Sequence, residues 1–284
     1  MKQFLFFIFL SLSQGVLARA PLEPLQIAQE FVDTDGWPEM KDYLCCEARQ
    51  QAKNETLGQQ IPATLQRNCL LIKQGDSTAV VAVELCDSVR RNDFYLHFSK
   101  ENKLWKLHAI RSLSMTQLGP PMLKLLAAMP ESEVALYNQK HPDADHAFTM
   151  GNLQLWMGAD ADIISHFTRH QASFQKALRL LQVRRYFAAA IDTVAAGAGE
   201  QAANTDPEIR ALLRKLYISR VTQHDTDCST CLEFIIGGRI DNTVGLLYQP
   251  KPAEVPAMHP ERVIVVRPIT KGWYLYKTTR GNTH

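Results

Sequence analysis

The chain has 284 residues and a formal net charge of +2, with 31 lysines and arginines against 29 aspartates and glutamates. This balance lacks the strongly basic character of nucleic-acid-binding proteins, so we expect no nucleic acid among its partners. The length is enough for one large domain or for two smaller ones of roughly 100 to 200 residues each, and we expect two.

The N-terminus predicts export. Lys2 is followed by an uncharged apolar run over residues 4–12 and then by small residues, which is the pattern of a secretory signal peptide over residues 1–18. The run is shorter than the roughly 20 residues that cross a bilayer, and no later run is long enough. We therefore expect a periplasmic or secreted chain with no membrane span after signal cleavage.

The first half of the mature chain reads as helices followed by strands. Apolar residues at helical spacing predict helices over 25–32 and 40–48, on either side of a break at Gly36-Trp37-Pro38. Short apolar runs separated by turn-forming residues then predict antiparallel strands over 69–73, 78–85, 94–99 and 104–110. Segregated helices and antiparallel strands indicate the α+β class.

This order of elements, with the strand 79–85 and the closing strand Leu104-Trp105-Lys106-Leu107, resembles the nuclear-transport-factor-2-like superfamily over about residues 21–113. The resemblance implies a cone-like domain of helices and antiparallel sheet, for which we take residues 19–116. That superfamily includes enzymes, ligand carriers and toxin-neutralising proteins, so the resemblance leaves the function open.

Gly119-Pro120-Pro121 predicts the start of a second domain over residues 120–284. Asp206 before Pro207 is typical of a helix start, and residues 195–199 and Gly237-Gly238 are predicted to be linker and turn. The helices of this domain are expected over 122–129, 132–139, 147–157, 160–181 and 207–216, and a four-stranded antiparallel sheet is expected over 232–236, 244–248, 262–267 and 273–276.

Residues 160–279 are similar to the C-terminal region of many exported bacterial proteins that have no assigned activity. The similarity rests on the Phe167, Phe174 and Leu178 stripe, on the helix at 209–218 and on the ending Trp273-Tyr274-Leu275-Tyr276. It implies a bacterial periplasmic or surface setting and brings no catalytic residues.

An even number of cysteines in an exported chain predicts disulfides. Cys228 and Cys231 are close enough to pair with each other, which leaves one of Cys45 and Cys46 to pair with Cys69 or Cys86. A strand is expected directly after Cys231, without the helix that lowers a thiol pKa in thioredoxin-like enzymes, so a structural bond is favoured over a redox role. A zinc site with His224 would lack an evident fourth ligand.

Other polar groups have structural interpretations. Asp162, His166 and His170 share one side of a helix, as metal ligands would, but the apolar stripe beside them favours packing. Asp145 is expected to cap a helix. Because nucleophile-elbow and phosphate-loop motifs are absent from the sequence, we predict no catalytic residues, and we assign no cofactor and no metal.

The stretch 179–220 is locally basic, and Arg184, Arg185 and Arg214 are its candidate partner-binding residues. A solvated helix face and a docking face for an acidic partner are both consistent with this charge. Our hypothesis is an exported, non-catalytic binding or interaction protein of the bacterial envelope, with an envelope protein as its partner. The alternatives are a thiol-disulfide oxidoreductase using Cys228 and Cys231, and a small-ligand carrier with a pocket in the first domain. The oligomeric state is left open.

Overall fold

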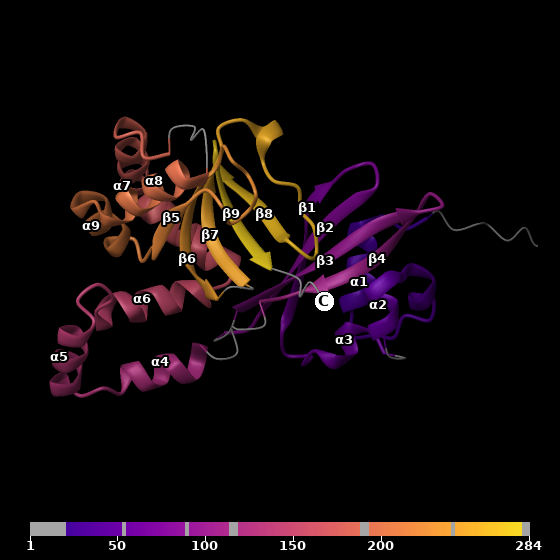
Figure 1. Cartoon of the computed structure of the whole chain (residues 1–284). Helices are drawn as coiled ribbons and strands as arrows, with labels where there is room; N and C mark the ends of the chain where they lie inside the picture. Colours follow the sequence, from indigo (N-terminus) through magenta and orange to yellow (C-terminus); the bar gives the residue numbers. More distant parts are fainter. Residues whose placement is uncertain are drawn as a thin grey trace, which may run out of the picture.

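The computed structural model describes residues 21–52, 55–88, 91–113, 119–187, 193–239 and 242–279. The predicted signal peptide, residues 1–18, lies outside these ranges. The α+β class is confirmed: helices accompany two antiparallel sheets, one of four and one of five strands (Figure 1). Among the described residues, no helix combines the length and the apolar character that crossing a membrane requires.

The first sheet is a meander of β1 (Gln66–Gln74), β2 (Thr78–Cys86), β3 (Arg91–Glu101) and β4 (Leu104–Arg111), in that spatial order. Helices α1 (Pro24–Val32), α2 (Cys46–Gln51) and α3 (Leu57–Gln60) lie along one face of it (Figure 1). Alternate strand residues point to this face, as period-two geometry requires, so that Val81, Leu96 and Leu107 pack in one core with Ile27 and Phe31.

The helix expected over 40–48 is interrupted. A 3-10 helix, η1 (Met40–Tyr43), ends before Leu44, and α2 begins only at Cys46. Leu44 forms an isolated parallel bridge with Leu107 of β4, and the Cys45 amide donates a hydrogen bond to the Leu107 carbonyl at 3.0 Å. Pairing with the sheet edge therefore overrides helical periodicity here and fixes Cys45 beside β4.

The second sheet contains β5 (Arg220–Thr222), β6 (Leu232–Arg239), β7 (Asn242–Tyr248), β8 (Val263–Thr270) and β9 (Trp273–Thr279), in the order β5-β6-β7-β9-β8. The short strand β5 adds a fifth strand to the four that were expected, because three residues are too few to show an alternating pattern. Pro268 lies on the edge strand β8 at a register shift, as expected. Gly272 closes the β8–β9 hairpin with a φ of +77°.

The helices of the second half are α4 (Gly119–Ala127), α5 (Glu131–Lys140), α6 (His146–Trp156), α7 (Asp160–Val183), α8 (Thr193–Thr205) and α9 (Pro207–Lys215). The long helix α7 packs on the second sheet, where the rings of Phe167 and Phe174 lie 5.1 and 5.8 Å from Trp273. Asp145 and Asp206 accept hydrogen bonds from the first-turn amides of α6 and α9, so both predicted caps are confirmed.

Two predicted breaks are regular structure. Residues 195–199 belong to α8, although each glycine inside a helix costs about 1 kcal/mol relative to alanine. Asn204 of α8 also exchanges two 2.8 Å hydrogen bonds with the backbone of Val221 in β5. Gly237 and Gly238 lie inside β6, and a Cβ on Gly238 would lie 2.2 Å from the Asn242 carbonyl oxygen.

The second face of the first sheet is covered by the second half of the chain. Asp160, at the start of α7, is fully buried and lies 2.7 Å from Lys277 Nζ of β9 and 3.2 Å from Arg267 Nη1 of β8. It also accepts a 2.7 Å hydrogen bond from the Tyr95 hydroxyl of β3, and Arg267 reaches Glu84 of β2 at 2.9 Å. This group of charges, which we call the joint, ties the two sheets together.

Candidate binding site

A pocket of about 370 Å³ lies at the C-terminal end of α7. Its size falls within the range of roughly 300 to 1,000 Å³ that is typical of ligand sites. Its lining is mainly apolar with a few polar groups. It comes from α7 and the turn after it, from the loop between β5 and β6 and the first residue of β6, and from the end of β7 and the loop that follows. The residues of this α7 pocket are Leu181, Gln182, Arg185, Phe187, Gln223, Thr230, Leu232, Tyr248 and Pro250.

The end of α7 shapes this pocket. The Arg184 amide still donates to the Leu180 carbonyl at 3.0 Å, but Arg185 has a φ of +55°, which turns the chain out of the helix. For a residue other than glycine the left-handed conformation costs roughly 1–2 kcal/mol, which the neighbouring contacts must offset. The turn brings Arg185 and Phe187 into the pocket lining together with the buried Leu181.

The three candidate arginines have different surroundings. Arg184 forms ion pairs with Asp206 and Glu208, and Arg214 pairs with Asp145 and donates to the Pro142 carbonyl oxygen. These contacts tie α9 to the ends of its neighbours.

Arg185 differs from both, because its guanidinium has no ion pair or hydrogen bond with any other residue that the structure describes. It lies exposed on the lining of the α7 pocket. Arg185 is therefore the arginine that is available to an acidic ligand.

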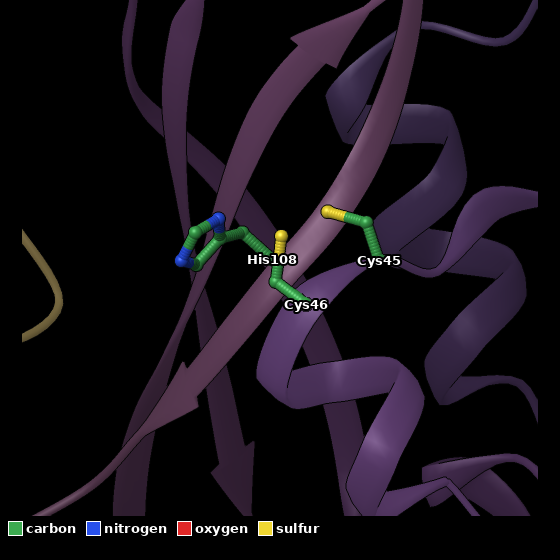
Figure 2. A group of neighbouring side chains, drawn as sticks. All are labelled: Cys45, Cys46 and His108. Carbon is green, nitrogen blue, oxygen red and sulfur yellow. The ribbon is translucent and has the colours of Figure 1, made fainter.

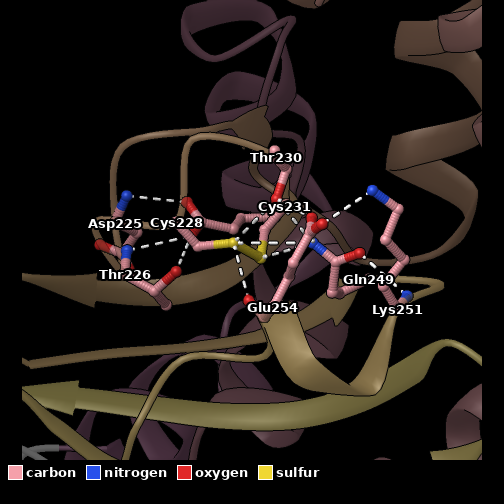
Figure 3. Close-up of a disulfide and its surroundings, with 9 residues drawn as sticks. Asp225, Thr226, Cys228, Thr230, Cys231, Gln249, Lys251 and Glu254 are labelled. Carbon is pink, nitrogen blue, oxygen red and sulfur yellow. Dashed lines mark hydrogen bonds and ion pairs between the residues drawn. A yellow bond between two sulfur atoms is a disulfide. The ribbon is translucent and has the colours of Figure 1, made fainter.

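The expected bond between Cys228 and Cys231 is present, with the Cα atoms 5.3 Å apart, in the loop between β5 and β6 (Figure 3). The buried Gln249 donates a 2.7 Å hydrogen bond to the Thr230 hydroxyl, which in turn donates to Glu254 at 3.0 Å. Thr230 also lines the α7 pocket. The disulfide and its polar neighbours therefore hold one wall of the pocket.

Glu233 supports the same loop from inside. Its carboxylate is fully buried and accepts hydrogen bonds from the amides of Asp225 at 2.7 Å and Thr226 at 2.9 Å, and from the Thr226 hydroxyl. Burial, the largest influence, raises the pKa of Glu233 to about 7 despite these donors. The carboxyl that organises the loop therefore titrates near neutral pH.

The other four cysteines are free thiols, so the second expected bond is not formed. Cys45 Sγ lies 3.5 Å from Ser99 Oγ of β3, and Ser99 pairs with Thr78, which is eight residues, or roughly 26 Å, along β2 from Cys86. Disulfides need Cα atoms within about 7 Å. Cys45 lies beside β4, at the opposite edge of the sheet from Cys69 on β1.

Cys45, Cys46 and His108 form a group that the sequence analysis did not predict. Their ligand atoms all lie within 4.8 Å of one another (Figure 2). The adjacent cysteines were considered only as disulfide partners, and His108 on β4 is distant in sequence. The Leu44–Leu107 bridge that brings these residues together has no sequence signature.

His166 has a packing role. One of its ring nitrogens, Nε2, hydrogen-bonds the Leu216 carbonyl oxygen at 3.0 Å, and its ring lies 4.6 Å from that of His170. Burial lowers the pKa of His166. Both histidines and Asp162 line a second cavity of about 460 Å³, in which the Nε2 of His166 is already bound to protein.

The fold and these sites define an α+β protein in which an apolar pocket lies beside an arginine that has no ion pair with the residues the structure describes. Comparisons with protein-family models, with proteins of curated function and with solved structures give no match to this chain.

Proposed function

We propose that this chain is an exported, non-catalytic binding protein of the bacterial envelope, and that the α7 pocket is its binding site. The observation that carries the proposal is the position of Arg185, exposed and unpaired among the described residues, on the lining of an apolar pocket. Pockets with apolar walls and a few placed polar groups are the usual form of a binding site.

The lining defines the chemistry of the ligand. Leu181, Phe187 and Leu232 would bury an apolar group, and Arg185 would form charge-assisted hydrogen bonds with an anion at the rim. The pocket is open, because Thr230 and Pro250 on its lining are exposed. We therefore propose as partner an envelope protein that inserts an apolar side chain next to a carboxylate.

The two alternative functions have less support. A thiol oxidoreductase needs a thiol that its surroundings activate, whereas Cys231 is fully buried directly before the strand β6 and its disulfide contacts the side-chain amide of Gln249. A carrier pocket in the first half would need apolar space beside the first sheet. A cavity of about 390 Å³ does lie there, but its lining of Gln29, Val32, Asp33, Thr34, Arg67, Asn68 and Cys69 is mainly polar. The side chains of Val81, Leu96 and Leu107 on the helix-facing side are instead fully buried against α1–α3.

A pair of dyes tests the pocket chemistry. Anilinonaphthalene sulfonate has an aromatic body and a sulfonate, and phenylnaphthylamine has the same body without the charge. We expect the wild-type chain to bind the anionic dye more tightly than the neutral one. Arg185→Gln should lower the affinity for the anionic dye by about tenfold or more, because a hydrogen bond to a charged group contributes about 1.5–3 kcal/mol.

The matched control is Arg179→Gln, which removes an exposed arginine of α7 that lies outside the pocket lining. This variant should bind both dyes as the wild type does. An equal loss of affinity for the anionic dye in the two variants, or no loss of affinity in Arg185→Gln, would refute the role of Arg185.

Export is tested separately. Expressed with residues 1–18 in a bacterial host, the chain should appear in the periplasmic or secreted fraction with Arg19 as its first residue, as measured by mass spectrometry of the intact protein. An unprocessed chain in the cytosolic fraction would contradict the envelope setting and leave the dye experiment unaffected.

A further inference from the structure

The start of α2 and the middle of β4 bring together donor groups that the α7 pocket does not use. Cys45 and Cys46 lie at the start of α2, and His108 follows Leu107, whose carbonyl accepts the Cys45 amide. One sulfur from each cysteine and one imidazole nitrogen lie within 4.8 Å of one another (Figure 2). The bridge between Leu44 and Leu107 that places these residues together is part of the fold, so the group is assembled when the first sheet forms.

We propose that Cys45, Cys46 and His108 bind a zinc ion. Thiolates and imidazole are the ligands that zinc prefers, at about 2.3 and 2.0–2.1 Å, and a tetrahedral arrangement at these distances places ligand atoms roughly 3.5–3.8 Å apart. The three donors are thus within about 1 Å of the required spacing, which side-chain rotation can supply.

A carboxylate that can serve as the fourth ligand lies beside Cys46. Glu101 Oε1 on β3 lies 3.9 Å from Cys46 Sγ, and its other carboxylate oxygen lies 3.8 Å from Lys106 Nζ. Ser99 Oγ lies 3.5 Å from Cys45 Sγ on the other side. Glu101 or a water molecule can complete the tetrahedron, and the Lys106 ammonium then offsets part of the negative charge that two thiolates and a carboxylate bring.

The site is open on one side. Cys46 is exposed, His108 is half-buried and Cys45 is 5 % exposed, so an ion would arrive from the Cys46 side. Zinc binding breaks two S–H bonds, forms two Zn–S bonds and releases the two protons to solvent.

The donor set selects the ion. Two sulfurs and a nitrogen are poor ligands for calcium and magnesium, which prefer oxygen. Monovalent copper also accepts thiolates, but the imidazole and the nearby carboxylate match zinc better. A disulfide between the adjacent Cys45 and Cys46 is the other chemistry open to these thiols, and it would abolish the site.

Calorimetric titration of the reduced, chelator-treated full chain with Zn²⁺ tests the proposal. We expect one ion per chain, with proton release seen as a dependence of the heat on the buffer. Cys46→Ser and His108→Gln should each weaken Zn²⁺ binding at least tenfold, and both replace side chains that are not fully buried, so folding should be retained. Cobalt loading should give a thiolate-to-cobalt absorption band in the wild type that Cys46→Ser reduces.

Cys69→Ser and Cys86→Ser are the matched controls, since they remove thiols from the same sheet outside the group. They should leave the zinc affinity unchanged. The proposal is overturned if the wild type binds no zinc, if it binds only Cu⁺, if its Cys45 and Cys46 resist reduction, or if the control variants lose as much affinity as Cys46→Ser and His108→Gln.

Discussion

Arginines occur both in the joint, which links the two sheets, and in the α7 pocket. The surroundings of their charges are opposite. In the joint, Arg267 is 18 % exposed at its side chain and contacts both Glu84 and the buried Asp160. At the pocket, Arg185 is exposed and has no partner among the described residues. Burial with partners makes a charge part of the architecture, whereas exposure without a partner beside an apolar surface makes it available to a ligand.

The stability of the protein is sensitive to substitutions in the joint, because the charged groups there are buried away from water. Lys277 Nζ lies 2.7 Å from Asp160 and 3.9 Å from Asp93, and its side chain is only 5 % exposed. Burial, the largest influence, and the nearby Asp160 raise the pKa of Asp93 to about 6. Removing one partner from such a group leaves the others without compensation.

The largest expected effect follows from Lys277→Met. It leaves Asp160 and Asp93 buried without their ammonium, and breaking a buried pair in this way costs about 3–5 kcal/mol. The free energy of unfolding, measured with urea, should fall by that amount. The double variant Lys277→Met with Asp160→Asn should recover part of the loss, and a loss below about 1 kcal/mol in the single variant would show that the joint does not tie the sheets together.

A smaller loss is expected when the disulfide beside the pocket is removed. Replacing Cys228 and Cys231 together by serine should lower the free energy of unfolding by about 2 kcal/mol, at the low end of measured values because the closed loop is short. The same variant should bind the anionic dye more weakly, since Thr230, which lies between the two cysteines, lines the pocket. A free energy of unfolding equal to that of Cys69→Ser, together with unchanged dye binding, would show that the disulfide supports neither the fold nor the pocket.

The pH dependence of stability should be altered by Glu233→Gln. The folded-state pKa of about 7 lies above the ordinary 4.5, so between these values the folded state binds more protons than the unfolded state. The free energy of unfolding of the wild type, relative to Glu233→Gln, should therefore fall as pH rises through this window and stay level below it. The exposed Glu131→Gln is the control, and parallel profiles for wild type and Glu233→Gln would contradict the burial of this carboxyl.

The smallest stability effect is expected at the pocket arginine. Arg185→Gln should change the free energy of unfolding by no more than about 0.5 kcal/mol, as usual for surface positions without contacts. Arg184→Gln should be the more destabilising of the two, because it breaks contacts with Asp206 and Glu208. Thermal unfolding of both variants checks this order, and the reverse order would mean that Arg185 has a structural role.

The sequence allowed the fold class and most elements to be predicted, because local periodicity and caps determine them. Residues 160–181 lie within α7, and Asp206 caps α9 as expected. The sequence could not show that Leu44 pairs with Leu107 and interrupts a helix, or that the three-residue strand β5 binds Asn204 of α8. Both depend on contacts between distant segments.

The same limit applies to the candidate sites. The spacing of Cys228 and Cys231 suggested their bond, since only two residues lie between them. Nothing local distinguishes Arg184, which forms ion pairs across the fold, from its neighbour Arg185, which has none within the described part of the chain. Likewise, the strand register that places His108 beside Cys45 and Cys46 arises only in the folded sheet.

Mapping the anionic dye on the wild-type protein by amide chemical-shift changes tests the central claim most directly. We predict that the largest changes fall on residues 181–187 and on Thr230, Leu232 and Tyr248 around the α7 pocket. Changes concentrated on the first sheet or on α4–α6, with the end of α7 unaffected, would contradict the proposal that this pocket is the binding site.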